Sequence, residues 1–394
     1  MTEANPTFNI DEAVRKVLPY MMEMREHFHA HPELSDEEYD TCKTIFQELS
    51  LMGVENVKIL AGTGVTGLIR GRLPGPVILL RADTDALPLT EKADCPYASL
   101  VDGVMHACGH DGHAANLLGV AKILTHHRDS LHGTVRLAFQ PAEEGNGGAA
   151  RMIDGGILRK PDVDYAIGLH VAGGLRKGEV SILNGPISAS CDDFTITLHG
   201  LGGHGAQLSQ CISPIQMGVD VIQAIQSYVY NCRQDGDGIV LSFGQFQSGA
   251  SANVIPDQAE LKGTLRTYNE EKRHKILKKL HLILDSVCST YGGTYDLDIV
   301  PFSPVCVNDN ALTDKVRALL IDTCPKVKVM SQRRGAGSED FAYFSAAVPG
   351  TFYYVGVNNG TVQLHHSPDF HWDSAALKYM CMTMVNIVYH FTEF

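Results

Sequence analysis

Three short apolar runs in the first half of the chain have the pattern of buried strands. They cover residues 76–80, 134–139 and 165–169. Between the first two, residues from about 113 to 126 carry apolar side chains at helical spacing, namely Leu117, Leu118, Ala121 and Leu124. Strands that alternate with helices are typical of an α/β fold. We therefore expect a mixed, largely parallel sheet with helices on both faces.

An earlier segment has the signature of a helix start. Residues 35–38, Ser-Asp-Glu-Glu, fit a capping box, in which a serine and a glutamate three positions later satisfy unpaired backbone N–H groups. The apolar residues that follow lie on one helical face: Cys42, Ile45, Phe46 and Leu49. The pattern predicts a helix that is capped by Ser35.

The pattern changes near residue 185. Phe194, Ile196 and Leu198 alternate with threonines, as in a half-exposed strand. A serine and a proline at 213–214 open a helix. We expect its buried face to carry Ile215, Val219, Ile222 and Ile225.

The elements after this helix complete a small domain. Strand patterns occur at 239–246, 259–267 and 295–300, and a helical pattern occurs at 269–291. With the strand and helix before them, these elements have the order β-α-β-β-α-β. The segment that they occupy is about as long as one small α+β domain. The sequence thus predicts an inserted domain at 187–300 within a discontinuous catalytic domain at 1–186 and 301–394.

Composition narrows the possible partners. The formal net charge of −13 argues against nucleic acid, because phosphate binding needs a positive field. No apolar stretch approaches the ~20 residues of a membrane helix, and residues 1–9 lack the features of a signal peptide. The ten cysteines are scattered without disulfide-like spacing. We therefore expect reduced thiols and a cytoplasmic protein that binds neither membrane nor nucleic acid.

Each of the three apolar strands ends in residues that bind metal ions or protons. Asp83 and Asp85 follow the first strand, Glu143 and Glu144 the second, and His170 the third. Sites in open α/β sheets form beyond the carboxyl ends of the strands, so these side chains should converge. Two further groups belong with them, one before the predicted helix and one after a strand at 351–357: Cys108, His110 and His113, and His365 and His366.

This mixture of ligands predicts a dinuclear metal site. A thiolate with imidazoles and carboxylates suits Zn²⁺, Ni²⁺, Co²⁺ or Mn²⁺ better than Mg²⁺. The ligands are too many for one tetrahedral ion, so we expect two divalent ions per subunit. Of the adjacent Glu143 and Glu144, one would bind metal and the other would act as general base. Each motif alone is weak, since a Glu-Glu pair is usually a solvated surface. Their convergence is the stronger signal.

Three other functions stay open on the residues alone. A cysteine hydrolase would use Cys108 with a histidine and would survive chelation. A metal-storage or sensor protein would have no use for Glu143 beside its ligands. A dipeptidase or aminopeptidase would need an acidic partner for a free amino group, and Asp83 and Glu339 keep that possibility open.

Nine motifs, in this order, are highly specific together. They are HPELS at 31–35, LRADTDALP at 80–88, CGHDGH at 108–113, QPAEE at 140–144, GLH at 168–170, GGHGA at 202–206, NVIP at 253–256, GTLR at 263–266 and GSEDF at 337–341. With them, nearly the whole chain resembles the amidohydrolase family of aminoacylases, hippurate hydrolases and indole-acetyl-amino-acid hydrolases, related to the dinuclear metallopeptidases. The resemblance implies a metal-dependent hydrolase that cleaves N-acyl amino acids to a carboxylic acid and a free amino acid.

The resemblance also implies roles for individual residues. The metal ligands would be Cys108, His110, Glu144, His170 and His366, with His365 as the alternative to His366. The family spacing places the last ligand two residues before a proline, which favours His366. Glu143 would be the general base, and Asp85 would orient a ligand.

The inserted domain would be a lid that also pairs two subunits into a homodimer. It would bring His204 over the neighbour's metals, while Asn253 and Arg266 would contact the substrate. The chain departs from the family pattern at 207–210, where the usual proline is missing, and at 370–374, which lacks the usual Asp-Glu pair.

Overall fold

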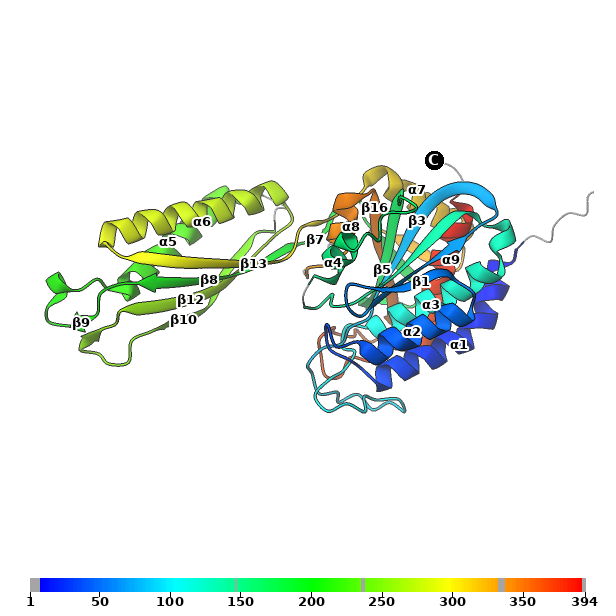
Figure 1. The fold of residues 1–394 in the computed structure, drawn as a ribbon, viewed down its shortest axis with the longest axis horizontal. Helices are drawn as coiled ribbons and strands as arrows, with labels where there is room; N and C mark the ends of the chain where they lie inside the picture. Colours follow the sequence, from blue (N-terminus) through cyan, green and yellow to red (C-terminus); the bar gives the residue numbers. More distant parts are fainter. Residues whose placement is uncertain (1–7, 146, 235–237, 332–336, 392–394) are drawn as a thin grey trace, which may run out of the picture. The chain divides into compact units, whose positions relative to one another are not determined.

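The computed structural model describes residues 8–145, 147–234, 238–331 and 337–391 (Figure 1). Most of residues 1–9, on which the expectation of no signal peptide rests, lies outside these ranges. The chain divides into two compact units. Unit 1 comprises Met1–Gly185, Val307–Arg334 and Asp340–Phe394, and unit 2 comprises Pro186–Cys306 and Gly335–Glu339.

Unit 1 is built on an eight-stranded sheet in the order β1-β2-β4-β3-β5-β16-β6-β15. The strands are β1 (Glu55–Leu60), β2 (Gly64–Arg70), β3 (Leu73–Asp83), β4 (His132–Gln140), β5 (Tyr165–Arg176), β6 (Glu179–Ile182), β15 (Lys328–Met330) and β16 (Gly350–Asn358). The central strands β4, β3, β5 and β16 run parallel, whereas β1 and β2 at one side and the β16–β6 pair are antiparallel. The expectation of a mixed, largely parallel sheet is confirmed.

Helices cover both faces of this sheet. The helices of unit 1 are α1 (Ile10–Ala30), α2 (Tyr39–Leu51), α3 (His110–His126), α4 (Gly148–Asp154), α7 (Asn310–Thr323), α8 (Ala342–Ala347) and α9 (Leu377–His390). On β5, Ile167 and Leu169 belong to the large core beneath α1, α3 and α9. The intervening Gly168 faces Phe341 and Phe352 instead, next to α8. Because successive residues of a strand point to opposite faces, α8 covers the other face.

The start of α2 differs from the prediction. Its buried residues include Cys42, Ile45 and Leu49, as expected, but the predicted capping box is wrong. The hydroxyl of Ser35 donates to Asp85 instead. The first N–H groups of α2 are satisfied by Glu33, whose carboxylate accepts from Asp40 and Thr41 at 3.0 and 2.8 Å.

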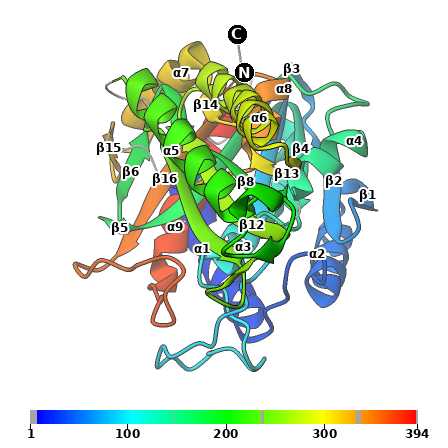
Figure 2. The ribbon, with the colours of Figure 1, turned by 90° about the vertical axis from the view of Figure 1, so that its left-hand side faces the viewer.

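Unit 2 has a four-stranded antiparallel sheet in the order β10-β12-β8-β13. Its strands are β8 (Ser190–His199), β10 (Val240–Ser248), β12 (Gln258–Thr267) and β13 (Thr294–Ser303), with a small ladder of β9 (Gly203–His204) and β11 (Val254–Ile255). Helices α5 (Pro214–Cys232) and α6 (Glu270–Tyr291) lie side by side on the sheet (Figures 1 and 2). The short strands β7 (Gly185–Ser188) and β14 (Cys306–Asn308) occur where the chain passes between the units.

The buried face of α5 agrees only in part with the prediction. Ser213 caps the helix as expected, because its side-chain oxygen accepts from the backbone N–H of Gln216. Of the four predicted residues, Ile225 is buried as expected, and Ile215 and Ile222 are half-buried. Val219 is 39% exposed, so its predicted place in the core is wrong. The other buried apolar side chains of the helix include Met217, Val221 and Val229.

Two general properties follow from the described residues. None of their helices combines the length and the apolar character needed to span a bilayer. All ten cysteines are unbridged, as expected from their scattered spacing.

Candidate metal centre

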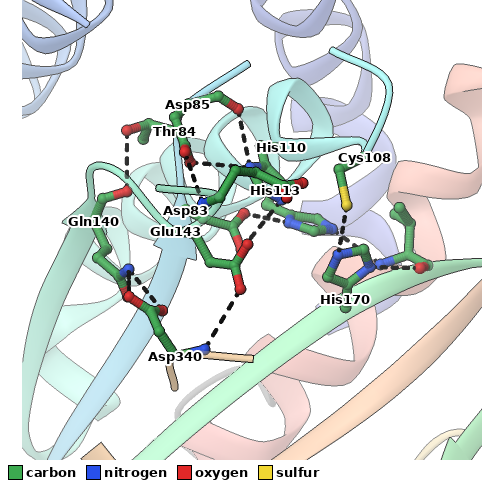
Figure 3. Close-up of polar contacts among 12 residues, drawn as sticks. Asp83, Thr84, Asp85, Cys108, His110, His113, Gln140, Glu143, His170 and Asp340 are labelled. Atoms are coloured by element: carbon green, nitrogen blue, oxygen red, sulfur yellow. Dashed lines mark hydrogen bonds and ion pairs between the residues drawn. The ribbon is translucent and has the colours of Figure 1, made fainter. Parts of the chain in front are cut away.

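Acidic residues lie where two central strands end: Asp83 is the last residue of β3, and Glu143 and Glu144 follow β4. The prediction that His170 follows the third strand is wrong, because β5 continues to Arg176 and His170 lies within it. Cys108 immediately precedes α3, whose first residue is His110. Figure 3 shows the side chains of Cys108, His110 and His170 directed toward one another, with Glu143 beside them.

Their donor atoms are close enough to share metal ions. The Cys108 sulfur lies 3.3 Å from His170 Nε2, and His366 Nε2 lies 3.0 Å from Glu144 Oε1. Three groups have all their ligand atoms within 4.8 Å of one another: Cys108, His110 and His170; Cys108, Glu144 and His366; and His110, Glu143 and Glu144. Because Cys108, His110 and Glu144 each belong to two groups, the structure brings all five predicted ligands and Glu143 into one cluster.

Asp85 connects two of these ligands. One carboxylate oxygen lies 3.2 Å from Nδ1 of His110, and the other accepts from the backbone N–H of Glu144 at 2.9 Å. The Ser35 hydroxyl donates to the same second oxygen at 2.7 Å. Asp85 therefore fixes the His110 ring and the Glu144 backbone together, as a carboxylate that orients a metal-binding histidine does.

Asp83 and His113 form a second buried pair behind the ligands. Nδ1 of His113 lies 2.5 Å from an oxygen of Asp83, and its Nε2 accepts from the backbone N–H of Val171 at 2.9 Å. Both nitrogens of His113 are thus engaged within the protein. Since Val171 follows His170, this contact also positions the strand that carries that ligand.

Glu38 belongs to this site, although the sequence pattern had predicted it to be the glutamate of a capping box. It is fully buried, and its carboxylate accepts from the Ala142 N–H at 2.8 Å and from the Thr63 hydroxyl at 2.5 Å. Ala142 has a φ of 51°, in the left-handed region that a non-glycine residue rarely adopts. Glu38 therefore holds the strained backbone position directly before Glu143.

Arg81 and Asp340 were part of quoted motifs but had no assigned role. The guanidinium of Arg81 donates to Asp83 at 2.5 Å and to Asp340 at 2.8 Å. Gln140 donates to both carboxylate oxygens of Asp340, each at 2.8 Å. The backbone N–H of Asp340 in turn faces Glu143 at 3.4 Å (Figure 3). The motif at 337–341 therefore contributes a support for Glu143.

The local charges favour a divalent cation in this cluster. Burial, reinforced by Glu144, Glu143 and Asp83, raises the pKa of the Cys108 thiol well above its ordinary value. Burial also opposes charge on His110, but Asp83, Asp85 and Glu144 outweigh it and raise the pKa of His110 to about 10. Burial is the main cause of the shift at Cys108, and the neighbouring carboxylates add to the pKa of both groups. A dication would neutralise this negative charge.

A second observation fits metal binding. Nε2 of His110 is buried and makes no hydrogen bond to any residue within the described ranges. Buried polar atoms are nearly always paired, so an atom of this kind marks a ligand position. The donor set of thiol, imidazole and carboxylate is suited to Zn²⁺ and neighbouring transition metals. The residues present therefore fit two divalent ions.

The two C-terminal histidines have different surroundings. His366 faces Glu144 and belongs to a ligand group with Cys108. Nε2 of His365 instead accepts from the backbone N–H of Gly173 at 3.2 Å, and burial lowers the pKa of His365 to about 4. The contact with Glu144 is consistent with the choice of His366 as the ligand. His365 keeps a buried Nδ1 without a hydrogen-bond partner among the described residues, so it stays the alternative.

The other three predicted site residues belong to unit 2. His204 and Asn253 are neighbours there, because His204 pairs with Val254 and the N–H of Gly205 donates to the Asn253 carbonyl at 2.9 Å. Both side chains are exposed. Arg266 lies near the far end of β12, opposite Cys191. The structure therefore brings His204 and Asn253 together but leaves Arg266 apart from them within the unit.

Known proteins share this fold and most of this length. Residues 79–390 match the model of the peptidase family M20/M25/M40. Thermostable carboxypeptidase 1 of Saccharolobus solfataricus is 37% identical over 372 residues, which cover 93% of each chain. N-acetylcysteine deacetylase of Bacillus subtilis is 37% identical over 366 residues, which cover 91% of this chain and 93% of the relative.

A solved structure from the same family is also similar to this chain. A B. subtilis protein, described as a dinuclear metal-binding peptidase of the M20 family, is 34% identical with a TM-score of 0.82. The match covers 95% of this chain and 98% of the other. The family model matches most of the chain, and the relatives are similar to it over more than nine-tenths of its length. The chain therefore belongs to the peptidase family M20/M25/M40.

Proposed function

We propose that this protein is a metal-dependent amidohydrolase that cleaves N-acyl amino acids to a carboxylic acid and a free amino acid. The observation that carries the proposal is the single cluster of Cys108, His110, Glu144, His170 and His366 around the carboxylate of Glu143. The name of the deacetylase relative supports this class of substrate. We take the five clustered residues as the ligands of two divalent ions, drawn from Mn, Zn, Co and Ni.

Glu143 has the position of a general base. Two bound divalent ions would supply Lewis acidity and a water molecule of lowered pKa. The Glu143 carboxylate, held by the Asp340 N–H and by the anchored backbone of Ala142, would accept the proton of the attacking water and pass it to the leaving amine. Asp85 keeps the ring of His110 and the backbone of Glu144 in place during these transfers.

The positions of His204 and Arg266 within unit 2 are compatible with a dimer. His204 pairs with Val254 of β11, shortly before β12 begins, whereas Arg266 is the second-last residue of β12 and pairs with Cys191. Since the two residues belong to different parts of the unit, we propose that their side chains reach one substrate from different subunits of a homodimer. His204 would stabilise the oxyanion, and Asn253 and Arg266 would bind substrate.

Unit 2 would accordingly act as a lid and dimerisation domain inserted in the catalytic domain. We further propose that the protein works in the cytoplasm, since its ten cysteines are unbridged.

The proposal is tested by the products formed from three substrate classes. The protein would be freed of metal, reloaded separately with Mn²⁺, Zn²⁺, Co²⁺ and Ni²⁺, and given N-acetyl amino acids, N-benzoyl amino acids and dipeptides. We expect the highest kcat/KM with an N-acyl amino acid. A preference of more than tenfold for free dipeptides would instead favour the dipeptidase alternative.

A further inference from the structure

Unit 1 contains a second group of potential metal ligands that the proposed mechanism does not use. It consists of His29 in the last turn of α1, and of Glu91 and Cys95 in the segment between β3 and α3. Nε2 of His29 lies 3.0 Å from Glu91 Oε1, and the Cys95 sulfur lies 3.9 Å from the same oxygen. All three ligand atoms lie within 4.8 Å of one another.

The orientation of His29 is that of a metal-binding histidine. Its Nδ1 lies 2.8 Å from an oxygen of Asp111, and the guanidinium of Arg25 donates to that oxygen at 3.1 Å. Metal-binding histidines usually donate their second ring N–H to a carboxylate, which fixes the tautomer and the ring plane. Here the contact with Asp111 directs Nε2 toward Glu91 and Cys95.

Glu91 is fixed in a similar way. Its Oε2 accepts from the backbone N–H of Ser99 at 2.6 Å, while Oε1 faces His29 and Cys95. The side chains of His29 and Glu91 are almost completely buried, at 1% and 5% exposure. Cys95 is only partly buried, so an ion has a route from solvent to the three donor atoms.

Polar atoms around the group are also unsatisfied. Both ring nitrogens of His106, whose ring centroid lies 6.4 Å from that of His29, are buried and form no hydrogen bond within the described part of the chain. The same holds for Nδ1 of His371. Buried polar atoms without partners mark a place where water or an ion is bound.

We propose that His29 Nε2, Glu91 Oε1 and Cys95 Sγ form a third metal site, separate from the dinuclear cluster, that binds Zn²⁺ with water in the fourth position. Thiolate, imidazole and carboxylate are each ligands of Zn²⁺ in proteins, and three protein ligands with one water complete a tetrahedral site. The dication replaces one proton on His29 and one on the Cys95 thiol, so the net charge of the buried group does not change. The ion ties the segment from Glu91 to Ser99 to helix α1, and through Asp111 to the start of α3.

The site is tested by counting zinc ions in the full chain. Wild-type protein and the variants Cys95→Ser and Cys232→Ser are stripped with chelator, reloaded with Zn²⁺, dialysed and analysed for zinc per chain. We expect three ions in wild type, two in Cys95→Ser, and three in Cys232→Ser, a matched control because Cys232 is also a partly buried thiol. Turnover of Cys95→Ser should stay within about twofold of wild type. Two ions in wild type, or equal counts in wild type and Cys95→Ser, would overturn the proposal.

A measurement on wild type alone covers the case in which the variant does not fold. Iodoacetamide is applied to metal-free and zinc-loaded protein, and the rate of alkylation at Cys95 is followed in its own proteolytic peptide. We expect Zn²⁺ to slow the reaction at Cys95 at least tenfold. Equal rates with and without Zn²⁺ would show that Cys95 binds no metal, whatever happens at Cys108.

Discussion

The candidate residues of the two units are held in different ways. In unit 1, Glu143, Asp85 and His110 are buried, and each is fixed by hydrogen bonds from other segments of the chain. In unit 2, His204 and Asn253 are exposed and lie on or beside a ladder of two residues per strand. Buried charged groups need such partners, whereas exposed groups are solvated by water. Unit 1 therefore holds its proposed metal ligands in fixed positions, whereas the exposed groups of unit 2 are free to adjust to the substrate that we propose they contact.

This difference predicts that metal binding depends on unit 1 and that unit 2 influences turnover alone. The largest effect is expected from chelation. EDTA should abolish hydrolysis, and Mn²⁺, Co²⁺, Ni²⁺ or Zn²⁺ should restore it, because the buried carboxylates lose their counter-charge without metal. Hydrogen exchange should quicken at the start of α3 and the end of β4 and stay constant in β8, β12 and α6. Full activity in a sample shown by elemental analysis to hold no metal would contradict the proposed mechanism.

Replacing the general base should have the next largest effect. Glu143→Gln preserves the shape of the side chain but cannot accept a proton, so kcat should fall by about 10²–10⁴-fold. Metal content should remain at the wild-type value. Glu144→Gln is the matched comparison, since it should lower metal occupancy instead. Normal turnover by metal-loaded Glu143→Gln would show that another group is the base.

A smaller loss is expected in unit 2. His204→Ala should lower kcat by about 10²-fold, within the range for one oxyanion donor, and should leave metal content unchanged. His199→Ala is a control, because His199 is another exposed histidine of this unit and pairs only with Asp296 among the described residues. A change in metal content with His204→Ala would contradict the division of roles between the units.

The same variant tests the dimer. Glu143→Gln and His204→Ala proteins, unfolded together and refolded as a mixture, should regain roughly a quarter of wild-type activity, by counting sites in randomly paired two-fold dimers. Only the site that combines an intact Glu143 with the neighbour's intact His204 would work. Verified mixed dimers that stay inactive would place the action of His204 within its own chain.

The smallest effect is expected from replacing Glu38, which holds the backbone next to Glu143. Glu38→Ala removes the acceptor of the Ala142 N–H and should lower kcat on the order of tenfold, less than the ~10²-fold that a 1 Å misplacement can cost. Glu38→Gln keeps an acceptor oxygen and should recover most of the loss. Glu48→Gln is a control in α2, the helix that directly follows Glu38, where the Glu48 carboxylate accepts from the Tyr20 hydroxyl. Equal kcat for wild type and Glu38→Ala, with KM unchanged, would remove Glu38 from the site.

The sequence was sufficient for the layout of unit 1 because its apolar strands and their polar ends follow one rule. Strands buried on both faces read as continuous apolar runs, and active-site residues follow them at one edge. The rule located Asp83, Asp85, Glu143 and Glu144 without any knowledge of contacts. It also drew attention to His170, although β5 continues past this residue.

The supporting residues could not be found this way. A serine and a glutamate three positions apart fit a capping box, yet Ser35 and Glu38 bind Asp85 and Ala142, which lie far along the chain. Local spacing carries no information on such long-range partners. Val219 was misplaced for a related reason, since the apolar pattern of α5 is broad and only packing against the sheet selects the face.

The place of β16 in the sheet affects how the protein is made. This strand lies beside β5, yet it is synthesised after the main segment of unit 2. His366 follows His170 by about 200 residues, a delay of about 10–40 s at ~5–20 residues per second on the ribosome. During that interval the nascent chain has Cys108, His110, Glu144 and His170 but not the last proposed ligand. A translation product that stops before His366 would therefore bind metal weakly, so completion of the metal centre is one of the last events of synthesis.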